Sequence, residues 1–539
     1  MRIPLMLVAT VALAATVASA LNNGMGRTPP MGYNTWFDVG CTPQMNQDNV
    51  IASAQRLVSS GLAGLGYSFV NIDDCWASAT RNPQSHQQEP SEAFSAGIAS
   101  LASQVHGLGL QLGLLTDRGE FTCNGRAGSL GFESLDAESY AGWGVDFVME
   151  AGCNATDDRA DAIAQYATMR DALNATGRDI FFAINEGQTW YAAQAAALAN
   201  SWRTGPTAPA PPLTLADDSD EAEEAATDSI VEPAEAAVDS ASPWEAILQN
   251  IDAMAVGALS NYAGPGGFND PGLLLSADHT GRLLISENQT RAQMGQWAVM
   301  ASPLLISGSL SRMSSYNLDT YSNAEVVRID QDPLGTQGVL VYSTSEGSLS
   351  QGASQIWAKQ LVDGSYALHF LNAHPNETRS LRCDAHCFAQ AGASLDVGWG
   401  IKVRDVWAQK DLLFTDAMDF TVSTLIPAGG SALIQFTWQP LSDEAQPGPM
   451  TPGDPHSTIK LDPSIQPRNH STIPSDAHTL LTLCIACEHL HRSLFRLLLC
   501  VVVRVCCTAA GASGSSNAVS LCTVISTRWA STIQPWDNR

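Results

Sequence analysis

Between residue 29 and about residue 310, short apolar runs alternate with longer stretches of helical composition. This alternation is typical of repeated βα units that share a parallel sheet. We expect eight strands, within residues 31–36, 67–74, 110–117, 144–151, 180–186, 200–203, 262–270 and 303–307. Eight such units predict a (β/α)8 barrel, the TIM-barrel form of the α/β class.

Several of the predicted strands end in polar or charged residues, namely Asp73-Asp74, Asp117, Arg203 and Asp270. Active sites of such barrels form at the C-terminal ends of the strands, so the chemistry is expected there. The alternative is that an Asp at a strand end caps the following helix, which we expect for one or two of them.

A different pattern follows the barrel. From residue 332 to 438, short alternating runs such as QIWAKQL and SALIQFTW predict a small antiparallel β domain. The chain is long enough for two such domains, because single cores stop growing near about 300 residues.

Two regions fit neither domain. Residues 204–243 are rich in Ala, Pro, Asp and Glu and contain no Lys or Arg, which predicts a disordered acidic insertion within the barrel region, 21–331. Residues 439–539 begin as a Pro-rich linker and continue as a Cys-rich tail containing SLFRLLLCVVVRVCC. This tail is either a membrane-associating or disulfide-rich appendage, or sequence that was never selected to fold.

The first 20 residues have the layout of a secretory signal peptide, with Arg2 before an apolar run and Ala18-Ser19-Ala20 at its end. A membrane anchor is the alternative, but the apolar run is shorter than the roughly 20 residues that span a bilayer. We therefore expect a secreted protein, or one in another secretory compartment. Five Asn-x-Ser/Thr sequences are compatible with glycosylation: Asn154, Asn174, Asn288, Asn376 and Asn469.

The formal net charge of −27 bears on the partners. Nucleic acids and anionic membranes both need a basic face, so this composition argues against either as a partner. Acidic pairs at a strand end suit sugars instead, because one carboxylate accepts hydrogen bonds from two adjacent hydroxyl groups. The segment NIDDCW (71–76) supplies such a pair, and MGYNTW (31–36) supplies an aromatic wall for the ring.

Nine motifs occur in order: TPPMGYNTW, LGYSFVNIDDCW, TDRGEFTC, GSLGFESLDAESYAGWGVDF, MRDALNATGRDI, NSWR, YAGPGGFNDP, SPLLISG and IDQDPLG. Over residues 24–438 the chain resembles the secreted α-galactosidases (melibiases) of glycoside hydrolase family 27. The resemblance implies a (β/α)8 barrel followed by a C-terminal antiparallel β-sandwich. It also implies hydrolysis of terminal α-linked galactose with retention, and α-galactosides as the partners.

Residue roles follow from the same resemblance. Trp36 resembles the sugar-facing aromatic residue, and Asp73 and Asp74 resemble the carboxylates that hold the 4- and 6-hydroxyl groups of galactose. Arg203 resembles the arginine near the 2-hydroxyl group, with a structural ion pair as the alternative. In INEG, Asn185 and Glu186 favour galactose over N-acetylgalactosamine.

The cysteines of the barrel match two disulfides of the family, and a third pair is expected in the β domain. The pairs are Cys41 with Cys75, Cys123 with Cys153, and Cys383 with Cys387. No metal or organic cofactor is implied, because the sequence has no HExxH pattern, no CxxC pair within the barrel and no phosphate-binding Gly loop.

The nucleophile departs from the family pattern. Retaining glycosidases use two carboxyl groups, one of which attacks the anomeric carbon. Where the family has a lysine and, two residues later, the nucleophilic Asp, this chain has Met149 and Ala151. Glu150 is a candidate substitute, but neighbouring side chains on a strand point to opposite faces, so it serves only if the strand twists or bulges.

The acid/base also departs. The family has it four residues after the arginine of NSWR and five before a tryptophan, and the insertion divides this interval. Counting from Arg203 gives Thr207, whereas counting back from Trp244 gives Asp239. Asp239 is the candidate because it can donate a proton, and the alternative is that it is one more solvated acid of the insertion.

The sequence therefore predicts an α-galactosidase-type hydrolase. A galactose-binding protein that Ala151 prevents from turning over is the competing class. A third interpretation is that the insertion, the substitutions at 149–151 and the tail are local sequence errors on an ordinary active enzyme.

Overall fold

The computed structural model describes residues 23–205, 242–256, 259–344, 347–393, 399–416, 422–440 and 459–461. The predicted signal peptide, residues 206–241 of the predicted insertion, and the Cys-rich segment after residue 461 lie outside the described residues.

Each of the eight predicted barrel strands is present, and the structure adds one short strand. They are β1 (Met31–Asn34), β2 (Phe69–Ile72), β3 (Gln111–Asp117), β4 (Phe147–Ala151), β5 (Phe181–Asn185), β6 (Ser201–Arg203), β7 (Phe268–Asp270), β8 (Leu274–Leu275) and β9 (Leu304–Ser307). The strands pair in parallel in the order β7-β6-β5-β4-β3-β2-β1-β9-β8.

The first and the last strand in this order, β7 and β8, are consecutive in the chain. Only residues 271–273 separate β7 from β8, and Pro271 has no N–H group for a ladder hydrogen bond. β7 pairs with β6, whereas β8 pairs with β9. The seventh barrel strand is thus in two pieces, and the sheet forms the predicted (β/α)8 barrel.

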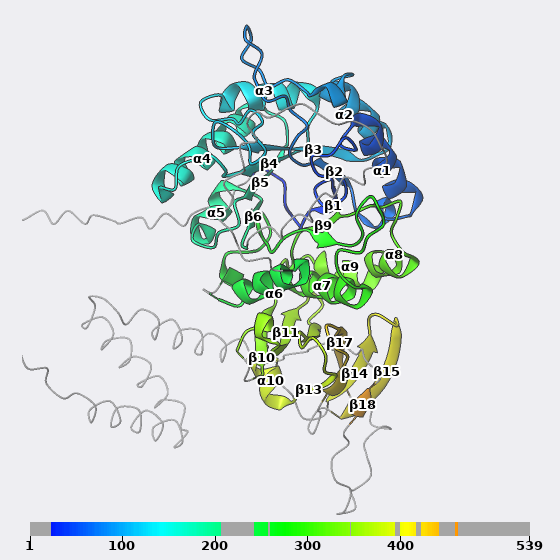
Figure 1. The fold of residues 1–539 in the computed structure, drawn as a ribbon. Helices are drawn as coiled ribbons and strands as arrows, with labels where there is room; N and C mark the ends of the chain where they lie inside the picture. Colours follow the sequence, from blue (N-terminus) through cyan, green and yellow to red (C-terminus); the bar gives the residue numbers. More distant parts are fainter. Residues whose placement is uncertain are drawn as a thin grey trace, which may run out of the picture. The chain divides into compact units, whose positions relative to one another are not determined.

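Helices surround the strands (Figure 1). They are α1 (Gln47–Ser59), α2 (Ile98–Gly107), α3 (Glu133–Trp143), α4 (Arg159–Ala175), α5 (Ala192–Leu198), α6 (Pro243–Met254), α7 (Glu287–Met300), α8 (Ser315–Tyr321) and α9 (Ala324–Asp330). A capping box of Ser242 and Glu245, with Pro243 at the first helical position, fixes the start of α6. The chain thus resumes a regular barrel element directly after the predicted insertion.

The period of two along each strand sorts side chains between the inside of the barrel and the helix layer. The interior holds a compact apolar cluster of Phe69, Leu115, Phe147, Met149, Phe181 and Ala183. The alternate residues, such as Leu114, Val148 and Ile184, belong to the larger cluster that includes the surrounding helices. This sorting decides which side chains reach the site.

The second domain is the expected β-sandwich. Its strands are β10 (Val339–Ser343), β11 (Ser354–Gln360), β12 (Tyr366–Asn372), β13 (Arg379–Cys383), β14 (Trp399–Asp405), β15 (Lys410–Asp416), β16 (Val422–Ile426), β17 (Ser431–Pro440) and β18 (Ile459–Leu461), with α10 (Ala385–Gln390) between β13 and β14. One sheet has the order β10-β11-β12-β17-β14-β15 and the other β13-β16-β18. Side chains from both sheets, among them Phe370, Leu381 and Ile426, form its core.

The end of the second domain differs from the prediction. β17 continues to Pro440, and β18 pairs in parallel with β16 although residues 459–461 were predicted to lie in the linker and tail. In β18, Ile459 and Leu461 flank Lys460, the alternation of a half-buried strand, but three residues are too short a pattern to predict one.

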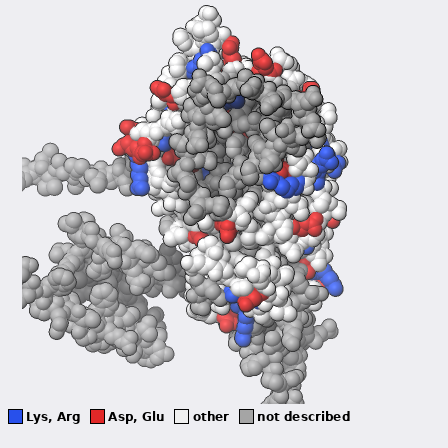
Figure 2. Space-filling model, viewed as in Figure 1, with Lys and Arg blue, Asp and Glu red and all other residues white. Residues whose placement is uncertain are grey.

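The surface and the helices bear on possible partners. On the face shown in Figure 2, the Lys and Arg side chains of the described residues are scattered among Asp and Glu and form no continuous basic stripe. None of the helices in the described part of the chain has both the length and the apolar character needed to cross a lipid bilayer.

Candidate active site

The ends of β1 and β2 bring together two residues of the predicted sugar site, Trp36 and Asp73. Asn34, the last residue of β1, donates from Nδ2 to Oδ2 of Asp73 at 2.8 Å, and its Oδ1 accepts from the Trp36 N–H at 2.8 Å. The Asp73 N–H donates to Oγ1 of Thr35 at 2.9 Å. Trp36 and Asp73 are therefore fixed relative to each other at the ends of two neighbouring strands, which pair in parallel.

Asp73 is a buried carboxylate with spare hydrogen-bonding capacity. Burial raises its pKa above the ordinary aspartate value, while the hydrogen bond from Asn34 and the positive charge of Arg203 act in the opposite direction. Its Oδ1 accepts from the Asp74 N–H at 2.9 Å. Since a carboxylate has about four lone-pair positions, two remain for sugar hydroxyl groups.

Asp74 is engaged differently. Oδ1 accepts from the Cys75 N–H at 2.7 Å and from Thr122 Oγ1 at 2.8 Å. Oδ2 accepts from the Asn124 N–H at 3.0 Å and from Asn124 Nδ2 at 2.9 Å. The protein itself occupies all four positions, so Asp74 holds the loop at 122–124 against β2 and has no spare capacity for sugar.

Arg203, at the end of β6, forms a structural ion pair and also lies near the predicted sugar site. Its Nε is 3.2 Å from Oδ2 of Asp270, the last residue of β7, so a buried ion pair is present. Asp270 also accepts through Oδ1 from the Gly272 N–H at 2.8 Å. Arg203 is nevertheless close enough to Asp73 to lower the pKa of that carboxyl group, which places its charge inside the site.

The two disulfides implied for the barrel are both present. They join Cys41 to Cys75 and Cys123 to Cys153, and a third joins Cys383 to Cys387 in the sandwich. Cys75 follows Asp74, and Cys123 lies between the two residues that bind the Asp74 carboxylate. The cross-links therefore stabilise the rim of the site.

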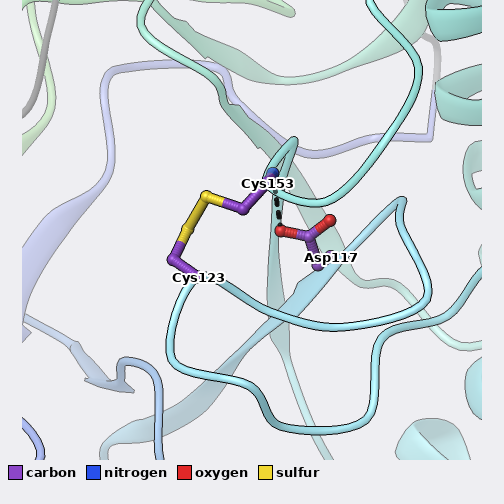
Figure 3. A group of neighbouring side chains, drawn as sticks. All are labelled: Asp117, Cys123 and Cys153. Atoms are coloured by element: carbon purple, nitrogen blue, oxygen red, sulfur yellow. Dashed lines mark hydrogen bonds between the residues drawn. A yellow bond between two sulfur atoms is a disulfide. The ribbon is translucent and has the colours of Figure 1, made fainter. Parts of the chain in front are cut away.

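Asp117, the last residue of β3, binds the segment that follows β4. Its Oδ2 accepts from the Cys153 N–H at 2.9 Å (Figure 3). Its Oδ1 accepts from the Gly119 N–H at 2.7 Å. Burial raises the pKa of Asp117 to about 7, although both N–H groups favour the ionised form. Asp117, Cys123 and Cys153 lie close together, but the two sulfur atoms are bonded to each other and are not thiolate ligands for a metal.

The end of β4 is regular. Met149, in the inner apolar cluster, has its Sδ 3.7 Å from Nδ2 of Asn34. Glu150 pairs with Thr116 and Ile184, and Ala151 pairs with Asp117 and Asn185, with no shift of register. Ala151 therefore continues the inner face, so its methyl group lies on the side of β4 where the resemblance led us to expect a nucleophile.

Glu150 does not lie on the inner face, because β4 keeps an unshifted register with both neighbouring strands and has no bulge that would redirect the side chain. Its carboxyl group interacts electrostatically with Asp117 and Arg118 at the end of β3, with Glu133 and Asp136 of α3, and with Tyr166 of α4. It is fully buried, and neither oxygen has a hydrogen-bond partner among the described residues. Burial raises its pKa well above the usual glutamate value.

The two residues of INEG also separate. Asn185 continues the inner face beside Ala151. Glu186 instead binds Arg118 at 3.2 Å and the Tyr166 hydroxyl group at 2.7 Å, both on the helix side of the barrel wall. The Glu186 carboxylate is thus held by protein partners, and the expectation that Asn185 and Glu186 favour galactose stays a prediction.

The two alternatives for the acid/base, Thr207 and Asp239, both lie outside the described residues. Sequence reasoning overlooked Asn34, Thr122 and Asn124. The first lies inside the motif MGYNTW, so its place in a sugar motif was the available signal. The other two lie about 50 residues from Asp74, and no local pattern connects them.

Comparison with known proteins covers both domains. The family profile described as alpha galactosidase A matches residues 28–202 and 228–332, and that of the alpha galactosidase C-terminal beta sandwich domain matches residues 351–436. The gap at 203–227 comprises Arg203 and the first part of the predicted insertion, and Asp239 lies inside the second matched range.

Individual relatives agree. A protein of Dictyostelium discoideum named "Probable alpha-galactosidase" is 32% identical over 450 residues, which are 81% of this chain and 99% of the relative. Alpha-galactosidase 3 of Arabidopsis thaliana is 35% identical over 396 residues, 73% of this chain and 78% of the relative. The crystal structure of alpha-galactosidase I from Mortierella vinacea superposes with a TM-score of 0.63 at 25% identity, covering 76% of this chain and 97% of that one. On these matches, together with the barrel, the sandwich and the site at the strand ends, the chain belongs to the α-galactosidases of glycoside hydrolase family 27.

Proposed function

We propose that this protein binds the terminal α-linked galactose of α-galactosides at the carboxyl ends of the barrel strands, and that the reaction of its site is retaining hydrolysis. The observation that carries the proposal is that Trp36, Asp73 and Arg203 lie together at the carboxyl ends of the barrel strands. An aromatic wall, an ionisable acceptor and a cation supply the contacts that a hydroxyl-rich ring requires. The names of the relatives support galactose as that ring.

The roles of the two aspartates differ in this proposal. Asp73 accepts hydrogen bonds from the sugar hydroxyl groups, because two of its lone-pair positions are free of protein donors. Asp74 acts through the shape of the loop at 122–124, since its four positions are occupied. Direct sugar contact by Asp74 requires that the sugar replace at least one of these donors.

The acid/base is assigned to Asp239. A carboxyl group that protonates the leaving oxygen is required in either stereochemical course of glycoside hydrolysis. Asp239 precedes the capping box of α6 by three residues, and α6 itself is a regular barrel helix. The second range that matches the family profile, residues 228–332, includes Asp239, which supports the assignment over a solvated acid of the insertion.

A second candidate function is galactose binding without turnover. It is favoured by the replacement of the nucleophile with Ala151, since a methyl group cannot form a glycosyl-enzyme. The position of Glu150 behind the barrel wall supports it further, because no carboxyl group of β4 then faces the anomeric carbon. Loss of a covalent nucleophile lowers kcat by many powers of ten.

One experiment separates the two candidates. The purified protein and its Asp239→Asn and Asp73→Asn variants are tested with an aryl α-galactoside, while galactose binding is followed by calorimetry. Turnover that is lost in Asp239→Asn supports hydrolysis. Binding without turnover, lost in Asp73→Asn, supports the second candidate, and the absence of both binding and turnover in the wild type contradicts the proposal.

The compartment belongs to the same proposal. We infer entry into the secretory pathway, because the layout of residues 1–20 and three disulfides within the two domains fit an oxidising environment. Expression of the full chain in a secreting host, with the N-terminus of the product sequenced, tests it. Cleavage after Ala20 is the expected result, and retention of Met1 in a cytosolic product contradicts it.

A further inference from the structure

The carboxylate of Asp73 is held from the neighbouring strand. We propose that Asn34 is a positioning residue that presents this carboxylate and the Trp36 backbone to galactose as one unit. The inference rests on the proposed binding of galactose at Asp73 and adds the residue on which that binding depends.

Both ends of the Asn34 amide are used, and the side chain is fully buried. Oδ1 accepts from the Trp36 N–H, and Nδ2 donates to Oδ2 of Asp73, each at 2.8 Å. Because the Trp36 N–H group can only donate, it fixes which end of the amide faces each partner. The NH2 group is therefore directed at Asp73 in every state in which the β1 end is folded.

The direction of the Asn34 NH2 group favours the ionised form of Asp73. A donor directed at a carboxylate stabilises the ionised form, and the ionised form accepts hydrogen bonds from two hydroxyl groups. Burial acts against ionisation of Asp73, so the donor from Asn34 is needed to keep the carboxylate in the form that accepts.

The other groups around Asp73 do not supply this contact. Met149 lies 3.7 Å from Asn34 through an uncharged sulfur atom. The charged groups facing Asp73 are Arg203 from β6 and Asp74 from its own loop; the first lowers the pKa of Asp73 and the second raises it. Among the side chains of the described residues, only that of Asn34 donates a hydrogen bond to the Asp73 carboxylate.

Two variants of Asn34 make the test directional. Asn34→Ala removes the donor, so galactose binding weakens about tenfold and is lost at a higher pH on the acid side than in the wild type. Asn34→Asp keeps the shape. At acid pH the carboxyl groups of residues 34 and 73 share one proton, which restores the hydrogen bond to Asp73, so this variant binds galactose as the wild type does. As the pH rises the shared proton is lost, and the affinity for galactose falls.

Calorimetry with galactose between pH 4 and pH 8 measures both profiles. Thr35→Val is the matched control: it removes the acceptor for the Asp73 N–H but leaves the carboxylate contact, so its affinity falls by a similar factor at every pH. Urea unfolding checks that each variant is folded. If Asn34→Ala does not fold, the isosteric Asn34→Asp variant carries the test alone.

The outcomes are distinct. Opposite pH shifts in the two Asn34 variants support the inference. Variants that bind galactose with the affinity and the pH profile of the wild type overturn it, as does a loss of affinity that is the same at every pH in Asn34→Asp. If the wild type binds no galactose, it is the proposed function that fails.

Discussion

Glu150 and Ala151 are consecutive residues of β4, yet they lie on opposite sides of the barrel wall. Ala151 pairs with Asp117 and Asn185 and continues the inner face that Met149 begins. Glu150 is directed at α3 and α4. The inner face of this strand therefore carries two uncharged side chains at the positions where the resemblance led us to expect a lysine and an aspartate.

The unpartnered carboxyl group of Glu150 predicts a pH-dependent gain of stability in Glu150→Gln. Because burial raises the pKa of Glu150 in the folded state, the unfolded chain releases this proton at a lower pH, and the wild type loses stability as the pH rises above about 4.3. The loss is about 1.4 kcal/mol per pH unit until the folded pKa is reached. Glu150→Gln avoids it, so we expect a gain of roughly 1–3 kcal/mol at pH 7 and little change at pH 4.

Urea unfolding at pH 4, 5.5 and 7 measures this gain. The control is Glu138→Gln. Glu138 is an exposed glutamate of α3, the helix that packs near Glu150. A gain of equal size at pH 4 and pH 7 contradicts the prediction. Turnover that disappears in Glu150→Gln contradicts the placement of Glu150 behind the wall.

The uncharged side chains at residues 149 and 151 predict that hydrolysis is recovered fully only when both a lysine and an aspartate are introduced. Ala151→Asp alone places a carboxylate beside the apolar Met149 side chain, where burial favours the neutral and less nucleophilic form. With Met149→Lys as well, the introduced cation keeps the introduced carboxylate ionised.

We expect the double variant to hydrolyse an aryl α-galactoside at least about a thousandfold faster than the wild type, the scale on which nucleophile losses are measured. The Ala151→Asp single variant should lie between them. The matched control adds Glu150→Gln to the double variant, which should leave kcat unchanged. A double variant that binds galactose but has no more activity than the wild type argues that a further part of the machinery is missing.

Asp73 and Asp74 are adjacent in sequence, but their variants should separate binding from stability. Asp73→Asn should weaken galactose binding about tenfold or more, and it should cost less unfolding free energy than Asp74→Asn, because two protein donors rather than four are directed at its carboxylate. Asp74→Asn directs an NH2 group at donors from Cys75, Thr122 and Asn124, and should cost about 2–4 kcal/mol of unfolding free energy.

Calorimetry and urea unfolding on the same two preparations test this separation. If Asp74→Asn is as stable as the wild type and binds no galactose, then the loop donors exchange for sugar and Asp74 is itself a contact.

The strands were predictable because each is a short apolar run, and the period of two is enough to place Ala151 and Glu150 on opposite faces from the sequence alone. The partners of the site were not predictable in the same way. Asn34 meets Asp73 because β1 and β2 pair with Asn34 opposite Asn71, a register that neither strand specifies alone. The donors to Asp74 come from a loop about 50 residues away. The second half of the seventh strand follows Pro271, where the rules for strand interiors predict an end.

The contact between the two domains yields the last prediction. Lys359 of β11 is buried, and its Nζ donates to the carbonyl oxygens of Ala298 at 3.1 Å, Ile329 at 2.6 Å and Asp330 at 3.3 Å. These carbonyls lie near the C-terminal ends of α7 and α9, where backbone acceptors lack helical partners and a cation is favoured. Burial lowers the pKa of Lys359, and the nearby carboxylate of Asp330 opposes that shift.

Lys359→Met keeps the apolar stem and removes the ammonium group, which leaves the carbonyls and the Asp330 carboxylate without their cation. We expect a loss of about 3–5 kcal/mol of unfolding free energy, the usual consequence of removing one partner from a buried charged network. Lys402→Met is the control, since Lys402 pairs with Asp411 on the surface of the same sheet and should cost less than about 1 kcal/mol. Equal losses in the two variants would mean that Lys359 contributes only a surface-like charge, and that apolar packing alone holds the sandwich to the barrel helices.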